Sequence, residues 1–283
     1  MRKEIMAGLL SLAAFVAVGT GTTSAYASAV KINGTTVNRQ FLNTNNYYQT
    51  KRATKVHLEY AQIGSDKGYT KSVTLPKGTI VGGQLGKSNT TGKMNAQLDF
   101  MGGQLNYALV NKSVKKGYLA DGDGYSTAIS SFKKISTPAY LPTWSYGDLY
   151  LGETSVAKQY RAVYPSQSVQ ITTNGYVEVH KKGSVKSWMD YYLNKPIASV
   201  KIKKTTTKGN TRYLYLSSAL KGFKTTRVGK KGAYEYRLIM TNLHKPVTIP
   251  SHDEDSDVSS FVSLYSLGGV TYYTPIGVSG DAD

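Results

Sequence analysis

Carboxylate patterns give the first candidates for chemistry in this 283-residue chain. Asp253, Asp255 and Asp257 have the alternating spacing of the first ligands in a calcium-binding loop. Val258 and Leu264 stand where such a loop requires a glycine and a bidentate glutamate. We therefore interpret the acidic run as a solvated linker, with a weak calcium site as the open alternative. We expect neither a metal centre nor a cofactor.

Two His–Glu pairs are the next candidates for metal binding. His57 and Glu59, and likewise Glu178 and His180, are two residues apart. On a β-strand each pair shares one face, because successive side chains alternate between the two faces. A transition-metal site needs at least a third ligand, which neither pair has nearby. The sequence favours solvated strand faces for both pairs.

Catalytic patterns are weak. Ser-x-x-Lys recurs along the chain, for example at Ser113/Lys116, Ser131/Lys134, Ser155/Lys158 and Ser218/Lys221. A chain this rich in Ser and Lys produces such matches by chance, and the companion motifs of penicillin-recognising enzymes are not convincing. G-x-S-x-G is absent from the sequence, and only Asp148 and Glu153 resemble the carboxylate pair of a glycosidase. We expect a non-enzymatic protein.

A basic stretch with interleaved aromatic residues is the strongest candidate for binding. It runs over residues 181–212 and contains Lys181, Lys182, Lys186, Trp188, Lys201, Lys203, Lys204 and Arg212. Ammonium groups suit phosphate, and aromatic faces suit the CH surfaces of sugars. We predict that this stretch binds a polyanion or a cell-wall polymer.

The charge of the chain is strongly partitioned. Lys and Arg number 35 against 17 Asp and Glu, a net charge of +18. Residues 28–250 hold 33 of the basic and 10 of the acidic residues, whereas residues 251–283 hold 6 acidic and no basic residues. A surface this positive favours an anionic partner. The acidic end can contact the basic body of a neighbouring copy, so self-association is a further possibility.

Residues 1–29 have the pattern of a secretory signal peptide. Arg2 and Lys3 precede an apolar run from Met6 to Val18, and Ala25-Tyr26-Ala27 is a cleavage signal. The run is too short to span a membrane. An exported protein does not meet cytoplasmic nucleic acid. The polyanions available to it are wall teichoic acids, lipid head groups and polysaccharides. We expect a secreted protein located at the cell wall or cell surface.

Alternating apolar residues and frequent glycine turns predict a mainly β fold. Val200-Lys201-Ile202-Lys203 alternates strictly, and Tyr234, Tyr236, Leu238 and Met240 recur at every second position. Gly268-Gly269 between two apolar runs predicts a hairpin over Phe261–Tyr273. Short helices are expected over Ser187–Leu193 and Ser217–Leu220. The chain has no Cys, so disulfides and thiol chemistry are excluded.

Composition shifts divide the chain into four segments. Pro138, Pro142 and Gly147 mark one boundary, and Pro250 marks another. We expect a signal peptide over 1–29, a first β unit over 30–137 and a second over 138–250. An acidic linker and a C-terminal hairpin follow over 251–283. Each β unit is expected to be a small barrel or sandwich.

Two segments resemble bacterial wall-binding barrels of the Src-homology type. They are Leu75-Pro76-Lys77-Gly78-Thr79-Ile80-Val81 and the segment from Arg212 to Lys221. The whole chain resembles the secreted surface-layer-type proteins of lactobacilli in its signal peptide, lack of Cys and abundance of Lys, Thr and Tyr. This resemblance implies non-covalent attachment to anionic wall polymers and, for some members, self-assembly. A wall hydrolase or other carbohydrate-processing enzyme and a host-glycan adhesin are the alternative functions.

Overall fold

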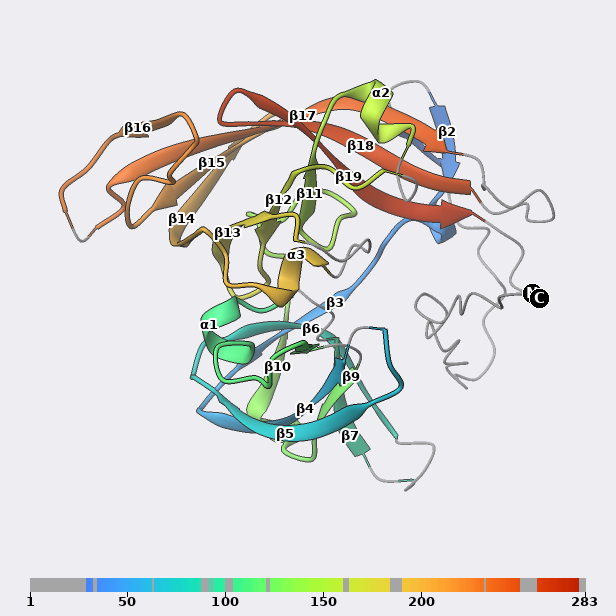
Figure 1. Ribbon diagram of the computed structural model, residues 1–283, viewed down its shortest axis with the longest axis vertical. Coiled ribbons are helices and arrows are strands. Elements are labelled where there is room, and N and C mark those ends of the chain that lie inside the picture. The colour runs from blue at the N-terminus through green and yellow to red at the C-terminus, as the bar shows by residue number, and fades with distance from the viewer. Residues whose placement is uncertain are drawn as a thin grey trace.

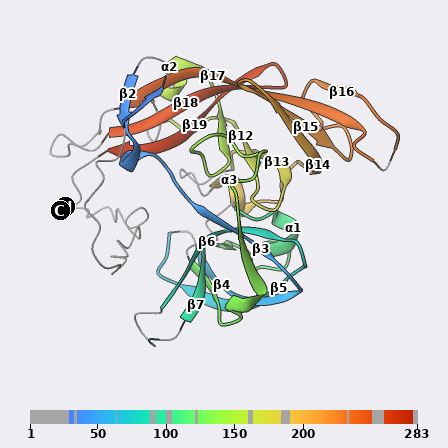
Figure 2. The same cartoon turned by 180° about the vertical axis from the view of Figure 1, so that it is seen from behind.

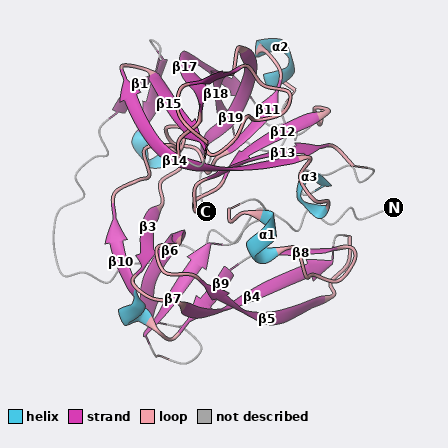
Figure 3. Cartoon of the chain, turned by 90° about the vertical axis from the view of Figure 1, so that its left-hand side faces the viewer, coloured by secondary structure: helices cyan, strands magenta, loops and turns pink. Residues whose placement is uncertain are grey.

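The protein is mainly β and consists of two bodies. The computed structural model describes residues 29–279, except 33–34, 63, 88–91, 93, 100–103, 121–122, 160–162, 184–189, 232 and 250–258. Figure 1 shows the smaller sheet below and the larger sheet above, and Figure 3 shows helices α1 and α3 in the space between them. None of the helices in the described ranges has the length and apolar character needed to cross a membrane.

The first body is a curled antiparallel sheet of eight strands. The strands are β3 (Asn46–Thr50), β4 (Thr54–Gln62), β5 (Gly68–Leu75), β6 (Ile80–Lys87), β7 (Met94–Asp99), β8 (Tyr118–Ala120), β9 (Asp123–Ser126) and β10 (Phe132–Ile135). Their order is β10-β3-β6-β7-β9-β4-β5, and β8 also pairs with β4. Leu58 and Tyr60 of β4, Leu75 of β5 and Phe132 of β10 share one core, which α1 (Tyr107–Val110) helps to cover.

The second body is a closed antiparallel barrel. Its strands are β11 (Asp148–Leu151), β12 (Gln167–Ile171), β13 (Tyr176–Lys181), β14 (Ala198–Lys208), β15 (Thr211–Leu216), β17 (Tyr236–Ile249), β18 (Ser259–Leu267) and β19 (Val270–Ser279). Each strand pairs with the next in this series, and β19 pairs with β11, which closes the ring. The short strand β16 (Thr225–Arg227) pairs with the beginning of β17. Helices α2 (Thr154–Ala157) and α3 (Asp190–Leu193) lie in its connections.

Side chains from all eight ring strands fill the barrel. Val200 and Ile202 of β14, and Leu238 and Met240 of β17, point into this core, as their alternation predicted. Tyr47 of β3 belongs to the same core, so the first body closes one side of the barrel with an aromatic ring. A closed barrel removes the unpaired strand edges that an open sheet would expose.

The C-terminal hairpin is present but is not a separate element. Gly268 and Gly269 have positive φ values of 59° and 87° and join β18 to β19 as expected. The expected division at 251–283 needs correction, because β18 pairs with β17 and β19 pairs with β11. The hairpin therefore completes the barrel. The acidic run over 253–257 lies outside the described residues.

The N-terminal strands also belong with the second body, which corrects the expected first unit over 30–137. β1 (Ala29–Ile32) and β2 (Thr35–Asn38) form a hairpin, and the 3-10 helix η1 (Arg39–Phe41) follows. Val37 and Leu42 pack against Ile276 of β19, and Asn43 N donates to Ile276 O at 2.8 Å. Figure 2 shows β2 beside β17 and β18. The signal-peptide region lies outside the described residues up to Ser28.

Two smaller expectations have different outcomes. A short helix does include Tyr191 and Tyr192, although residues 187–189 lie outside the described residues. The helix expected over Ser217–Leu220 is wrong, since this segment contains only bends before a turn in which Phe223 N donates to Leu220 O.

Replacement of Gly147 by Ala is expected to lower the free energy of unfolding by about 3 kcal/mol. Gly147 has φ 104°, and an added Cβ would lie 2.1 Å from the carbonyl oxygen of Ile171. Gly86→Ala is the matched control, because a Cβ there meets no atom within 4 Å. Chemical denaturation of both variants tests this. Equal stability of the two would show that the β11 entry tolerates a side chain.

Candidate functional site

The strands around β14 carry most of the positive charge of the second body. Residues 198–249 contain 12 Lys and Arg residues and one acidic residue, Glu235. Glu235 forms an ion pair with Arg227 at 3.3 Å. β14 and β15 extend beyond the end of β13, and Figure 1 shows these strands with β16 projecting to one side of the barrel. This end of the molecule is therefore strongly cationic.

The outer surface of these strands combines cations with tyrosine rings. Lys201 Nζ lies 4.4 Å from the ring centre of Tyr176, and Arg237 Cζ lies 5.5 Å from that of Tyr213. Lys204 Nζ lies 5.9 Å from the ring centre of Tyr215 and 5.6 Å from that of Tyr234. We call the surface formed by Tyr176, Lys201, Lys203, Lys204, Tyr213, Tyr215, Tyr234 and Arg237 the basic-aromatic face.

Strand pairing places these residues in register. Lys204 of β14 pairs with Tyr215 of β15, which pairs with Arg237 of β17. Neighbouring strands are about 4.8 Å apart, so the two cations stand about 10 Å apart with a ring between them. The Nε atom of Arg237 is buried and has no hydrogen-bond partner among the described residues. Lys204, Tyr215 and Arg237 therefore form a row in which two positive charges flank an aromatic ring.

The structure brings together only part of the predicted basic stretch. Lys201, Lys203 and Lys204 lie on the outer face of β14. Lys181 and Lys182 are exposed at the opposite end of β13, about 16 Å along the strand from the residue that pairs with Lys201. Lys182 Nζ lies 5.9 Å from the ring centre of Tyr164.

Arg212 and the remaining two predicted residues lie elsewhere. Arg212 belongs to the opposite face of β15 and donates to Ala139 O at 3.1 Å and to Thr143 Oγ1 at 2.9 Å. These contacts tie β15 to the segment that enters the barrel, which is a structural role. Lys186 and Trp188 lie outside the described residues.

Sequence reasoning missed the aromatic half of the face. Tyr213, Tyr215 and Arg237 stand outside or at the edge of the predicted stretch, although Tyr213 and Tyr215 alternate with Leu214 and Leu216. That alternation separates an outer Tyr row from an inner Leu row, and it was a usable signal. The pairing of β15 with β17, which brings Arg237 beside Tyr215, had no local signal.

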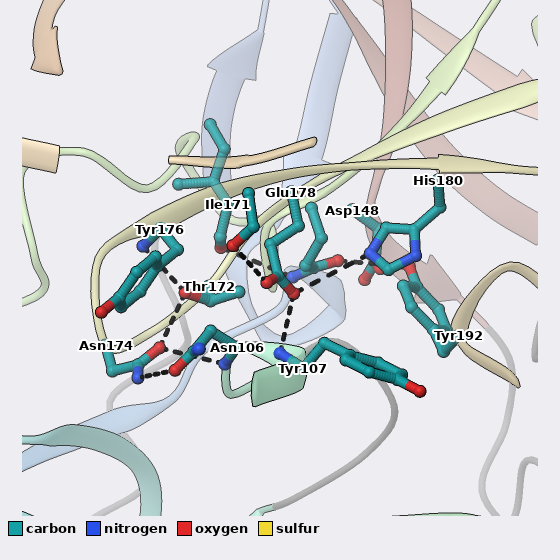
Figure 4. A network of polar contacts seen from close by, with 12 residues as sticks. Asn106, Tyr107, Asp148, Ile171, Thr172, Asn174, Tyr176, Glu178, His180 and Tyr192 are labelled. Carbon is teal, nitrogen blue, oxygen red and sulfur yellow. Dashed lines mark hydrogen bonds and ion pairs between the residues drawn. The ribbon is translucent and has the colours of Figure 1, made fainter. Parts of the chain in front are cut away.

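A second cluster of functional groups is buried between the two bodies. Glu178 and His180 of β13 share one face, as predicted, but they are only 1% and 2% exposed. The expectation of a solvated strand is therefore wrong for this pair, because α3 and the first body cover it. Figure 4 shows the carboxylate of Glu178 between Tyr107 and His180.

Each carboxylate oxygen of Glu178 accepts one hydrogen bond. Tyr107 N, at the beginning of α1 in the first body, donates to Oε2 at 2.9 Å, and Ser199 Oγ donates to Oε1 at 2.7 Å. His180 Nε2 lies 3.9 Å from Oε2. Burial raises the pKa of Glu178, while the two hydrogen bonds act in the opposite direction.

The imidazole of His180 is held in an apolar and aromatic setting. Neither ring nitrogen has a hydrogen-bond partner among the described residues, and Tyr192 lies edge-on at 5.2 Å between ring centres. Burial lowers the pKa of His180 to about 4, and the backbone of Tyr191 acts in the opposite direction. The ring is therefore neutral at neutral pH.

The same region docks the first body on the barrel. Thr173 N and Oγ1 both donate to Gln104 O at 2.7 Å. Asn174 Nδ2 donates to Asn106 Oδ1 at 2.6 Å, and Asn106 N donates to Asn174 Oδ1 at 3.1 Å. Residues 104–107, which we call the docking segment, thus bind the β12–β13 turn and end on the carboxylate of Glu178 (Figure 4).

The other candidate groups that the structure describes have local contacts of their own. His57 stacks on Tyr125 at 4.8 Å between ring centres and lies 3.2 Å from Ser72 Oγ. Asp148 accepts a hydrogen bond from the Tyr192 hydroxyl and lies near Glu178 and His180 (Figure 4). Within the described ranges, no three His, Asp or Glu side chains are grouped so that they could hold a metal ion.

Comparison with known proteins gives no matching family, no matching curated protein and no matching solved structure.

Proposed function

We propose that this is a secreted, non-enzymatic protein of surface-layer type that attaches non-covalently to anionic cell-wall polymers. The observation that carries the proposal is the basic-aromatic face, on which three of the four cations lie over tyrosine rings. The signal-peptide pattern over residues 1–29 supports an extracellular polyanion as the partner.

The chemistry of the face suits a polymer that alternates phosphate and polyol or sugar. Lysine acts as a compact charge on phosphate, and Lys outnumbers Arg by 28 to 7 in the chain. Tyrosine rings offer flat apolar surface to CH groups at a low cost in side-chain entropy. Teichoic acids have both features and are therefore the proposed ligand class.

Two alternatives remain distinguishable by simple assays. A wall hydrolase would clear a suspension of purified walls, whereas a binding protein would only sediment with them. A host-glycan adhesin would bind sulfated or sialylated glycans in preference to bacterial walls. Self-association through the acidic run is a separate proposal, which analytical ultracentrifugation at low ionic strength tests.

The direct experiment is sedimentation with purified walls before and after extraction of teichoic acid. We expect binding to intact walls and at least a tenfold loss after extraction. Release of the protein from cells by concentrated LiCl would support non-covalent attachment. Equal binding to both wall preparations would overturn teichoic acid as the partner and point to peptidoglycan.

Wall binding is expected to weaken steeply with salt. If four cations contact phosphate and the relation known for DNA applies, affinity falls about 1,000-fold or more between about 50 and 500 mM salt. Titration of the protein with walls across this range measures the slope. A flat response would contradict a phosphate-dominated interface and favour stacking on sugars.

A further inference from the structure

The buried pair of Glu178 and His180 has no place in polymer binding. It lies at the contact between the docking segment and β13, where Glu178 accepts a hydrogen bond from Tyr107 N at 2.9 Å. His180 places two unpartnered ring nitrogens next to that carboxylate. Buried polar atoms without partners are rare in native structures and often mark a functional device.

We propose that this pair makes the docking of the first body on the barrel sensitive to acid, so that residues 104–107 release from β13 as His180 becomes protonated. At neutral pH the pair contains an accepting carboxylate and a neutral imidazole. In acid both groups take up protons, and a positive charge appears on a ring that is 2% exposed. Burial of an uncompensated charge is costly, so the interface opens to hydrate it.

The sign of the effect follows from the linkage between protonation and opening. A histidine with a pKa near 6.5 when hydrated and about 4 when buried favours the closed state above pH 6.5. This advantage is lost as the pH falls from 6.5 toward 4. One pKa unit is a tenfold change in an equilibrium constant, so at about pH 4 the ratio of open to closed states rises about 100-fold.

Glu178 acts in the opposite direction. Burial raises its pKa, so the closed state takes up this proton more readily than the open state. Protonation of Glu178 therefore relieves the closed state as the pH falls, and it reduces the effect of His180. Removing His180 should reduce the change in opening between pH 7 and pH 4, whereas removing Glu178 should enlarge it, which a merely structural role would not do.

The neighbouring groups set the background for this titration. Tyr107 of α1 contacts Glu178, Tyr191 and Tyr192 of α3 lie beside His180, and Asp148 of β11 lies near the pair (Figure 4). Burial holds the pKa of Tyr192 well above its ordinary value, so this hydroxyl stays protonated throughout the acid range. Asp148 is a further carboxylate near the pair and accepts a hydrogen bond from Tyr192, so Asp148→Asn serves as a control.

Hydrogen exchange of the full-length protein between about pH 7 and pH 3.5 tests the proposal, after correction for intrinsic exchange rates. We expect protection of residues 104–107 to fall toward pH 4 by at most about 100-fold, because Glu178 offsets part of the effect of His180, while β18 and β19 stay protected. His180→Phe should reduce the loss of protection between pH 7 and pH 4. Glu178→Gln keeps this side chain neutral at every pH and so removes the offset, and the loss of protection over this range should then be larger than in the wild type. Asp148→Asn should preserve this order.

Several outcomes would overturn the proposal. In the wild type alone, the proposal is overturned if protection of residues 104–107 stays constant until the barrel itself unfolds. If His180→Phe responds to pH as the wild type does, the loss of protection comes from carboxylates and not from His180. If His180→Phe does not fold, His180→Gln replaces it, and NMR titration of the wild-type ring decides whether its pKa lies near 4 or near 6.5.

Discussion

A chain that ends at Ile249 is expected to lose the cooperative fold of the second body. β18 and β19 supply seven apolar or aromatic side chains that are at most 2% exposed: Val262, Leu264, Tyr265, Leu267, Tyr272, Tyr273 and Ile276. Full burial of one such side chain contributes about 1.5–3 kcal/mol, so the hairpin contributes about 10–20 kcal/mol. That is at least comparable to the net stability of most domains, which is about 5–15 kcal/mol.

The truncation also opens the ring. β17 loses its partner over Met240–Ile249, and β11 loses its partner at Tyr150 and Leu151. Circular dichroism and thermal unfolding of the truncated chain, compared with a chain ending at Ser279, measure the effect. We expect a cooperative transition only in the longer chain. A normal transition in the shorter chain would mean that the hairpin is dispensable, as the abrupt change in charge at Pro250 first suggested.

The local β structure of this protein is predictable from sequence. Alternation marked β14 and β17, and Gly268-Gly269 marked the hairpin, because a buried strand face and a tight turn impose residue types at neighbouring positions. The mainly β fold follows from these local signals. Tyr234 was assigned to a strand but is 47% exposed and lies before β17, since the end of an alternating pattern does not fix a strand boundary.

The closure of the barrel was not predictable, because it depends on pairing between distant segments. β19 pairs with β11 more than 100 positions earlier in the chain, and Leu42 forms a bridge to Gly277. Side chains at such pairings are ordinary apolar residues that would suit many partners. For this reason the sequence suggested separate terminal segments, whereas the fold places both terminal hairpins on the second body.

The two sites differ in how much sequence could reveal. Lys201, Lys203 and Lys204 were identifiable as charges on a strand face. The spacing of Glu178 and His180 placed them on one face but could not decide between solvent and burial. That decision depends on α3 and on the docking segment, which begins about 70 positions before β13 in the chain. A charged pair on an alternating strand is usually solvated, and here a second body covers it.

Neutralising the basic-aromatic face is expected to cause the largest loss of wall binding. The variant replaces Lys203, Lys204 and Arg237 with Gln. If each cation contacts one phosphate, the relation known for DNA predicts a loss of about 100-fold to 1,000-fold at about 0.1 M salt. The same relation predicts that the slope of log affinity against log salt falls by about 3. Lys203 and Lys204 are exposed, and such substitutions usually cost less than about 0.5 kcal/mol each. Arg237 is half-buried, but Gln keeps its polar character, so the barrel should stay folded.

A matched control separates this face from the overall charge. Lys77, Lys133 and Lys134 are exposed on the first body, and their replacement with Gln removes the same charge. Wall sedimentation of both variants across a salt series gives affinities and slopes. If binding depends on the register of Lys204, Tyr215 and Arg237, the control variant should bind within about threefold of the wild type, because exposed charges beyond one Debye length contribute little.

Equal losses of affinity in both variants would show that the polymer responds to the net charge of the protein and that the face has no special role. A loss of affinity without a change in slope would instead assign the contact to the tyrosine rings, whose binding does not release counterions.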